Sequence, residues 1–151
     1  EAVIEWSEVT EHGDVLCRAM LDHVWLDTGR ILDLKIVRSA EHSACERAAD
    51  SYGYPLQHAV YTAALEALRP EIVGRVEMDF AFCEPYAPYA VNVLPADGIF
   101  REIGRREWAR SLNTWAGCVR RDQWPDYPRN QRLNLPVWRL RREGYAAGEE
   151  I

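Results

Sequence analysis

Lysine is almost absent from this sequence: Lys35 is the only one, and every other basic residue is arginine apart from the histidines. Long apolar runs are absent too, and none approaches the length needed to cross a bilayer. No charged and then apolar leader follows Glu1. We therefore expect a cytoplasmic protein without a membrane partner. Because the first residue is not methionine and a strand pattern begins at once, we also expect the natural chain to have an N-terminal portion before Glu1.

Closely spaced cysteines are also missing. Cys17, Cys45, Cys83 and Cys118 are scattered along the chain, and no Cys-x-x-Cys pair occurs. This spacing argues against a structural zinc site and against an iron–sulfur cluster. We expect four reduced and mostly buried thiols instead.

The sequence has no surplus of positive charge, since its formal net charge is −6. This balance argues against a general basic surface for nucleic acid. It does not exclude a phosphate-binding site built from carboxylates and a divalent cation, because the cation restores positive charge locally.

What the sequence does contain is enough apolar material for one packed domain. The chain has 151 residues, of which 48% are hydrophobic, and the aromatic residues include 6 Trp and 7 Tyr. This size and aromatic content predict a single domain over residues 1–151 and exclude an intrinsically disordered chain.

The first part of the sequence predicts three strands in an antiparallel meander. Residues 2–6 alternate in polarity, residues 15–26 follow a turn signal at 12–14, and residues 31–37 follow a hairpin turn at 27–30. The apolar positions of the third strand indicate the centre of a sheet.

The rest of the sequence predicts helices, two further strands and a tail. A helical region at 40–68 breaks near Gly53, Pro55 lies in the first turn of its second helix, and Pro70 ends it. The elements expected after it are strands at 76–83 and 89–94, a helix at 97–120 capped by Asp97, and a tail at 124–136 that wraps the surface, anchored by Trp124 and Trp138. The order β-β-β-α-β-β-α predicts an α/β domain with a mixed sheet flanked by helices.

The segment Asp33-Leu34-Lys35 carries the strongest local signal for chemistry. Alternation along a strand places Asp33 and Lys35 on the same face, about 7 Å apart. A lysine ammonium can contact a metal-bound water and a phosphate oxygen as a point charge, which a planar guanidinium does poorly. On this pair alone, a plain salt bridge at a sheet edge is an equally good interpretation, because Asp-x-Lys is common by chance.

Asp22 strengthens the functional interpretation of this segment. It ends the strand before the turn at 27–30, so a hairpin would bring it close to Asp33 at one end of the sheet. Two converging carboxylates repel each other unless a positive charge lies between them, and a divalent cation with oxygen ligands is the usual solution. Two alternatives are open: Asp22 caps a turn, as Asp often does, or Asp27 in the turn takes the ligand role.

A third group of polar residues lies in the predicted second helix. Gln57 and Tyr61 are four residues apart and therefore share one helical face. Both are neutral hydrogen-bonding groups that suit phosphate oxygens. Taken alone, they fit a half-buried amphipathic helix with a core tyrosine better than a site.

Together these residues resemble the PD-(D/E)XK nuclease superfamily. Asp22, then Asp33-Leu34-Lys35, then Gln57-x-x-x-Tyr61 follow its order, and the last motif is similar to that of its RecB-like branch. Within that branch the chain most resembles the RecE, or exonuclease VIII, type of phage recombination exonuclease. The resemblance includes the run at 53–61 and the tail, where Trp124-Pro125 precedes Leu135-Pro136-Val137-Trp138, and it covers nearly the whole chain.

The resemblance implies a restriction-endonuclease-like core that binds Mg²⁺, with Mn²⁺ able to substitute. It implies metal ligands at Asp22 and Asp33, with the Leu34 carbonyl as a further ligand. The family usually has an upstream helix that carries another site residue, which this chain lacks; Glu1 or Glu5 could supply an acidic ligand, but neither aligns firmly. The iron–sulfur cluster of some RecB-like relatives does not fit the cysteines here.

The resemblance also implies an activity. Lys35 would position the attacking water and stabilise charge, while Gln57 and Tyr61 would organise the site or touch DNA. The implied enzyme is a metal-dependent DNA exonuclease that hydrolyses phosphodiester bonds of linear double-stranded DNA from an end, in phage-type recombination. Its implied partners are double-stranded DNA ends and a single-strand annealing protein, and a homo-oligomer is left open. The alternative is an inactive or incomplete nuclease-fold module that acts in DNA binding or assembly.

Overall fold

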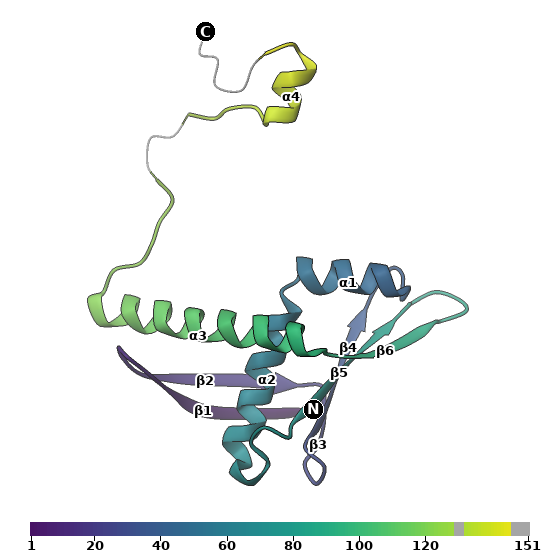
Figure 1. Cartoon of the computed structure of the whole chain (residues 1–151), viewed down its shortest axis with the longest axis vertical. Helices are drawn as coiled ribbons and strands as arrows, with labels where there is room; N and C mark the ends of the chain where they lie inside the picture. Colours follow the sequence, from purple (N-terminus) through teal and green to yellow (C-terminus); the bar gives the residue numbers. More distant parts are fainter. Residues whose placement is uncertain (129–131, 146–151) are drawn as a thin grey trace.

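The computed structural model describes residues 1–128 and 132–145, which form two sheets, the helices packed against them and a separate C-terminal helix (Figure 1). The strands are β1 (Ala2–Thr10), β2 (Gly13–Leu21), β3 (His23–Trp25), β4 (Arg30–Ile36), β5 (Glu77–Cys83) and β6 (Val91–Pro95). The helices are α1 (His42–Ser51), α2 (Tyr54–Leu68), the 3-10 helix η1 (Pro70–Ile72), α3 (Gly98–Arg121) and α4 (Val137–Arg142). No helix in these two ranges is both long and apolar enough to span a membrane.

The two sheets differ in size and in strand direction. Strands β1 and β2 form an antiparallel hairpin by themselves, whereas the second sheet has the order β3-β4-β5-β6. Within it β4 and β5 run parallel, and the other two pairs are antiparallel. The helical segment from α1 to η1 connects the parallel pair, as a crossover must. The predicted α/β class with a mixed sheet is confirmed.

The predicted strand at 15–26 is wrong in one respect, because it divides at Asp22. Leu21 ends β2 in the first sheet, and His23 begins β3 in the second. The expected three-stranded meander is therefore two hairpins in separate sheets. The reason is visible in the burial: Leu21 is fully buried, and continued alternation would bury His23 and Trp25, yet both are exposed and Val24 is half-buried. The strand changes phase at Asp22.

The predicted break in the helical region near Gly53 is confirmed. Gly53 joins α1 to α2 with φ of 67°, a left-handed conformation that glycine adopts without a steric penalty. Pro55 follows in the first turn of α2, where its missing N–H leaves no hydrogen bond unmade. The predicted N-cap of α3 is also confirmed, since the Asp97 carboxylate accepts the backbone N–H of Phe100 at 2.7 Å.

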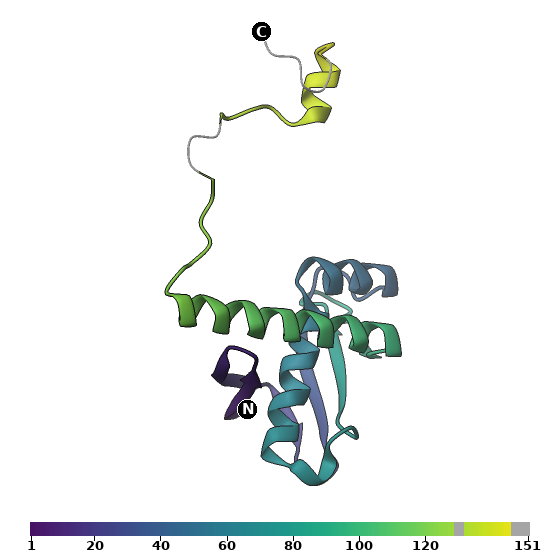
Figure 2. The ribbon, with the colours of Figure 1, turned by 60° about the vertical axis from the view of Figure 1, so that its left-hand side comes forward.

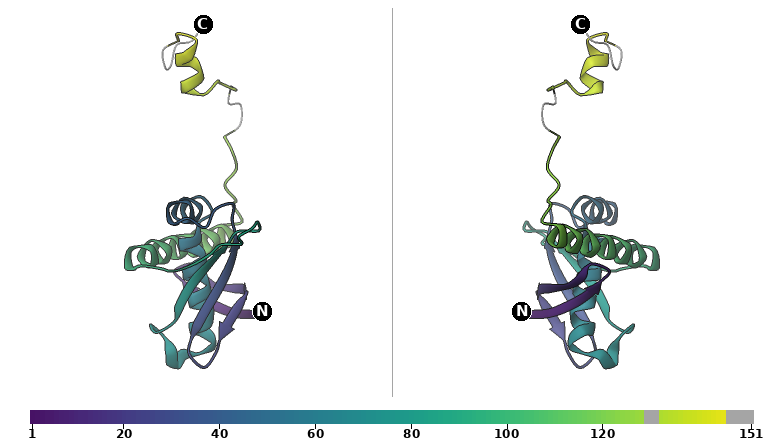
Figure 3. Two further views of the ribbon diagram at one scale, coloured as in Figure 1. Left: turned by 90° about the vertical axis from the view of Figure 1, so that its right-hand side faces the viewer. Right: turned by 90° about the vertical axis from the view of Figure 1, so that its left-hand side faces the viewer.

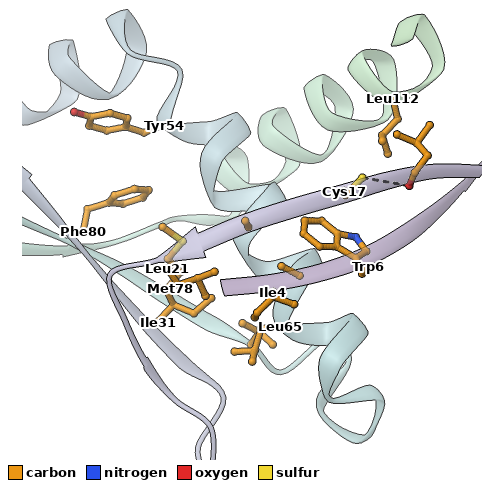
Figure 4. Close-up of a cluster of buried hydrophobic side chains, with 14 of the residues drawn as sticks. Ile4, Trp6, Cys17, Leu21, Ile31, Tyr54, Leu65, Met78, Phe80 and Leu112 are labelled. Atoms are coloured by element: carbon orange, nitrogen blue, oxygen red, sulfur yellow. Dashed lines mark hydrogen bonds between the residues drawn. The ribbon is translucent and has the colours of Figure 1, made fainter. Parts of the chain in front are cut away.

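Helix α2 lies between the hairpin β1–β2 and the four-stranded sheet, and α3 crosses it (Figure 2). Apolar side chains from both sheets and from α2 meet in one core, which includes Ile4, Leu21, Leu65 and Met78 (Figure 4). The crossing is close at Gly104 of α3, where an added Cβ would lie 2.0 Å from the carbonyl oxygen of Pro55. Glycine at this position therefore allows α3 to cross the first turn of α2 at close range.

The predicted course of the tail is wrong in part. Trp124 does pack on the domain, with its ring 5.0 Å from that of Trp115. Residues 129–131 of the predicted tail lie outside the described residues. Residues 132–145, including α4, do not wrap the surface but lie apart from the two sheets (Figures 1 and 3). Trp138 is 67% exposed and does not anchor the tail. All four cysteines are free thiols, and three of them are buried, as predicted.

Candidate active site

The inward face of β4 carries two charged side chains at the edge of the hydrophobic core. Asp33 and Lys35 alternate with Leu34 and point to the same side as buried Ile31. The Asp33 side chain is almost completely buried, and the Lys35 side chain is only 15% exposed. Their charged groups form an ion pair, with Lys35 Nζ 2.5 Å from Asp33 Oδ2. The two predicted residues are therefore in direct contact.

Helix α2 places Gln57 against both members of this pair. The Gln57 Nε2 amide donates to Asp33 Oδ1 at 3.0 Å, and Lys35 Nζ donates to Gln57 Oε1 at 2.8 Å. One amide therefore satisfies an acceptor and a donor at once, which it can do because it carries both kinds of group. Three of the predicted site residues, Asp33, Lys35 and Gln57, are therefore joined by one ion pair and two hydrogen bonds.

Asp22 reaches the same region from the break between β2 and β3. Its exposed carboxylate accepts the backbone N–H of Leu34 at 2.8 Å. Leu34 lies beyond Leu32, the last residue of β4 that pairs with β3. The N–H and C=O of one strand residue point to the same side of the strand. The Leu34 carbonyl is therefore directed toward the same sheet edge as Asp22.

Burial and charge act against each other at Asp33. Burial raises the pKa of Asp33 above its usual range, the hydrogen bond and the charge of Lys35 lower it, and the nearby charge of Asp22 raises it again. A hydrogen bond from Gln57 is a further lowering effect. Asp22 accepts the backbone N–H of the residue that follows Asp33, so the two carboxylates lie in one small region around β4 and their charges repel each other. A cation between them would relieve this repulsion.

Tyr61 lies one helical turn after Gln57 and contributes to both the core and the site. Its ring packs against the core, as the structural interpretation of this helix predicts. The pKa of its phenol is raised first by burial and further by the charges of Asp33 and Asp22, and a hydrogen bond with Gln57 lowers it. Tyr61 lies one turn of α2 after the amide that contacts Asp33 and Lys35.

The sequence interpretation missed Tyr54 as a neighbour of this network. Its ring centroid lies 4.5 Å from Lys35 Nζ, and the ring is stacked on Phe80 of β5 at 5.5 Å. Tyr54 is three residues before Gln57, so both lie on one face of α2. That spacing is a signal that could have identified it.

Two acidic residues that were considered as further ligands lie elsewhere. Asp27 is in the turn at the opposite end of β4, where its carboxylate accepts the backbone N–H of Thr28. Glu5 faces Arg18 across the β1–β2 hairpin, with Arg18 Nε 3.8 Å from Glu5 Oε1. Neither residue extends the pair formed by Asp22 and Asp33.

The donors at this edge suit a hard divalent cation. They are the carboxylates of Asp22 and Asp33 and a backbone carbonyl at Leu34, all of them oxygen ligands. Within residues 1–128 and 132–145 there is no cluster of three or more His, Cys, Asp or Glu residues that could hold a metal ion by itself. Mg²⁺ does not require such a cluster, because it commonly uses one or two carboxylates and completes its shell with water and substrate phosphate.

The comparisons with known proteins agree with this fold. Residues 1–131 match the family described as a PDDEXK-like domain of unknown function, DUF3799. Among solved structures, a "putative exonuclease" from Eubacterium rectale is similar, with a TM-score of 0.59 at 13% identity over 95% of this chain. The chain spans 56% of that protein's length. No curated protein matches the sequence. Because this match covers most of the chain, the chain belongs to the PDDEXK-like family DUF3799.

Proposed function

We propose that this chain is the nuclease core of a metal-dependent DNA exonuclease that hydrolyses phosphodiester bonds of linear double-stranded DNA. The observation that carries the proposal is the network of Asp33, Lys35 and Gln57, which lies beside Asp22 at an accessible sheet edge. It combines two carboxylates for a cation with one ammonium at the place where a phosphate would be held.

A purely structural role explains this network poorly. Replacing a buried ion pair by apolar side chains of similar volume is often neutral or stabilising, so a buried pair is weak support for stability. Lys35 is moreover the only lysine in a chain that otherwise uses arginine as its strong cation. A compact ammonium at this one place fits a chemical requirement better than a packing requirement.

The chain's own residues would each have a defined part in the reaction. When bound, a divalent cation supplies positive charge that offsets the phosphate charge and makes the attacking water more acidic. Asp22, Asp33 and the Leu34 carbonyl would hold this cation. Lys35 would orient the attacking water and stabilise the negative charge that develops on the phosphate oxygens. Gln57 would keep Asp33 and Lys35 in place, and Tyr61 would organise the site or contact DNA.

The finer assignment rests on the sequence motifs. The run at 53–61 and the tail resemble RecE-type exonucleases, which implies action from DNA ends in phage-type recombination, beside a single-strand annealing protein. Under the same proposal the natural cation is Mg²⁺, Mn²⁺ can substitute for it, and the enzyme acts in the cytoplasm. Association into a homo-oligomer is compatible with this assignment.

Cleavage of DNA with and without ends tests the proposal. Linear duplex and covalently closed circular duplex are incubated with the protein in Mg²⁺, in Ca²⁺ and in EDTA. We expect loss of the linear duplex in Mg²⁺ only, while the closed circle persists. Cleavage of both substrates would replace the exonuclease by an endonuclease, and activity in EDTA would exclude a metal-dependent mechanism.

A second candidate is an inactive or incomplete nuclease-fold module for DNA binding or assembly. The observation in its favour is that the chain spans 56% of the similar solved structure, so the rest of a nuclease could be required for activity. A gel shift of linear duplex in Ca²⁺ together with intact duplex in Mg²⁺ would support this alternative and contradict the first.

A further inference from the structure

The ammonium group of Lys35 rests against an aromatic ring as well as against polar partners. Lys35 Nζ is 4.5 Å from the centroid of the Tyr54 ring and 5.9 Å from that of Phe80. A cation within about 6 Å of a ring centroid is attracted by the negative electrostatic potential of the ring face. The ammonium donates a hydrogen bond to Gln57 and forms an ion pair with Asp33, so the ring adds a contact of a different kind.

The Tyr54 ring is itself buried and stacked on another ring. It is 9% exposed and lies nearly parallel to the ring of Phe80, with an interplanar angle of 16°. Figure 4 shows the two rings facing each other, one from the start of α2 and one from β5. Phe80 is fixed in turn by a T-shaped contact with Phe100 of α3. The surface beneath the ammonium is therefore one of a set of packed aromatic rings.

We propose that Tyr54 is a positioning residue for Lys35, a role that rests on the proposed nuclease function. In the free protein Asp33 is the closest partner of the ammonium. A cation bound by Asp33 would draw on the same carboxylate and weaken that ion pair. The Tyr54 ring is not a ligand for a hard cation. Its contact with the ammonium would therefore persist when the cation binds. Together with Gln57 it keeps Lys35 directed at the reacting phosphate during catalysis.

Three variants separate positioning from packing. Tyr54→Phe keeps the ring and loses the hydroxyl, whereas Tyr54→Leu keeps an apolar side chain and loses the ring. Phe100→Leu is the matched control, because it removes a partly buried ring that packs on Phe80 but does not contact Lys35. Pentafluorophenylalanine at position 54 keeps the shape of the ring and reverses its electrostatic potential, and it replaces Tyr54→Leu if that variant does not fold.

The first measurement uses the fact that the chain has one lysine. Labelling with ¹³C-lysine gives a single side-chain Cε–Hε signal, recorded without metal and without DNA. We expect it upfield of free lysine in the wild type, in Tyr54→Phe and in Phe100→Leu, because the protons lie near the ring. In Tyr54→Leu it should move toward the free position. A wild-type signal at the free position would overturn the contact, whatever the nuclease assay shows.

The second measurement separates the catalytic constant from substrate binding. We expect Tyr54→Leu, or the fluorinated ring, to lower kcat about tenfold with little change in KM, since a well-buried cation–π contact is worth about 1–2 kcal/mol. Tyr54→Phe and Phe100→Leu should keep kcat within about threefold of the wild type. Equal losses in Tyr54→Leu and Phe100→Leu would reduce Tyr54 to a packing residue. An inactive wild type with the upfield signal intact would instead contradict the proposed function.

Discussion

Strands β2 and β4 differ in the kind of side chain that they direct into the protein. The inward side chains of β2 are all apolar and buried: Val15, Cys17, Ala19 and Leu21. In β4 the inward face carries Asp33 and Lys35 after Ile31, while Leu34 and Ile36 on the outward face are 51% and 64% exposed. The second half of β4 therefore buries its charges and exposes its apolar residues.

The difference identifies β4 as the strand at which burial of charged side chains is energetically unfavourable. Burial of an ionised group is unfavourable unless it is paired and hydrogen-bonded, and here burial does raise the pKa of Asp33. The cost is offset by Lys35 and by the Gln57 amide, and the Tyr54 ring adds a contact to the ammonium. A local violation of the packing pattern, supported by such a specific shell, is expected at functional sites.

The largest loss of activity is expected when either of the two acidic residues at β4 is replaced. Asp33→Asn and Asp22→Asn each remove a charged ligand and little volume. We predict that each lowers the Mg²⁺-dependent cleavage rate about a thousandfold or more, because a catalytic cation contributes several kcal/mol. Circular dichroism should show an intact fold. If both variants retain near-full activity in a quantitative cleavage assay, these residues do not form the site.

A smaller loss is predicted at Lys35, and it distinguishes chemistry from packing. Lys35→Arg keeps the charge and Lys35→Met keeps the apolar stem. We predict that both variants fold and bind DNA, yet lose on the order of a hundredfold in kcat, as for other single electrostatic contacts to a transition state. A plain salt bridge predicts a different result, since arginine would serve as well as lysine. Full kcat in Lys35→Arg would leave Lys35 with a structural role only.

His58, the residue after Gln57, shows the cost of a buried ionisable group away from the site. Burial first, and then the charges of Arg101 and Arg105, lower the pKa of His58 to about 4. The unfolded chain takes up this proton near pH 6.5, so the stabilisation is complete above that pH and is lost as the pH falls toward about 4. We predict a contribution of about 3 kcal/mol at most.

The matched variant for this pH effect is His58→Gln, which cannot take up a proton in this range. Urea unfolding at pH 7 and at pH 5 should show a steeper loss of stability for the wild type than for the variant. Parallel losses in the two proteins would mean that His58 is protonated in the folded state as readily as in the unfolded chain.

The smallest effect is predicted on the outward face of β4. Ile36→Thr keeps a β-branched side chain, and the position is exposed. We predict a change in the free energy of unfolding within about 0.5 kcal/mol, as for most surface substitutions, and no change in cleavage. A loss of 2 kcal/mol or more in urea unfolding, the order typical of core truncations, would mean that this face is covered in solution.

Much of the fold followed from local patterns in the sequence. The break at Gly53 and the start of α3 at Asp97 were predictable because each depends on nearby residues and backbone geometry. The division at Asp22 was not predicted, although the apolar phase shifts there from odd to even positions. The course of the tail depends on tertiary contacts, which residue patterns alone do not give.

The candidate site was predictable only in part. Alternation in β4 put Asp33 and Lys35 on one face, and helical spacing put Gln57 and Tyr61 on another. These two faces meet because α2 packs against the sheet. The family resemblance implied this packing, whereas residue spacing alone did not. Tyr54 was missed because an aromatic residue at the start of a helix fits a core role, although its spacing from Gln57 places both residues on the face of α2 that meets Lys35.

Crystals soaked in Mn²⁺ and measured by anomalous diffraction test the central assignment most directly. We predict an anomalous peak at the open edge of β4, within about 2.5 Å of carboxylate oxygens of both Asp22 and Asp33 and near the Leu34 carbonyl. The peak should be absent from Asp33→Asn crystals soaked in the same way. A well-occupied peak elsewhere, or none at this edge at a Mn²⁺ concentration that supports cleavage, would contradict the assignment.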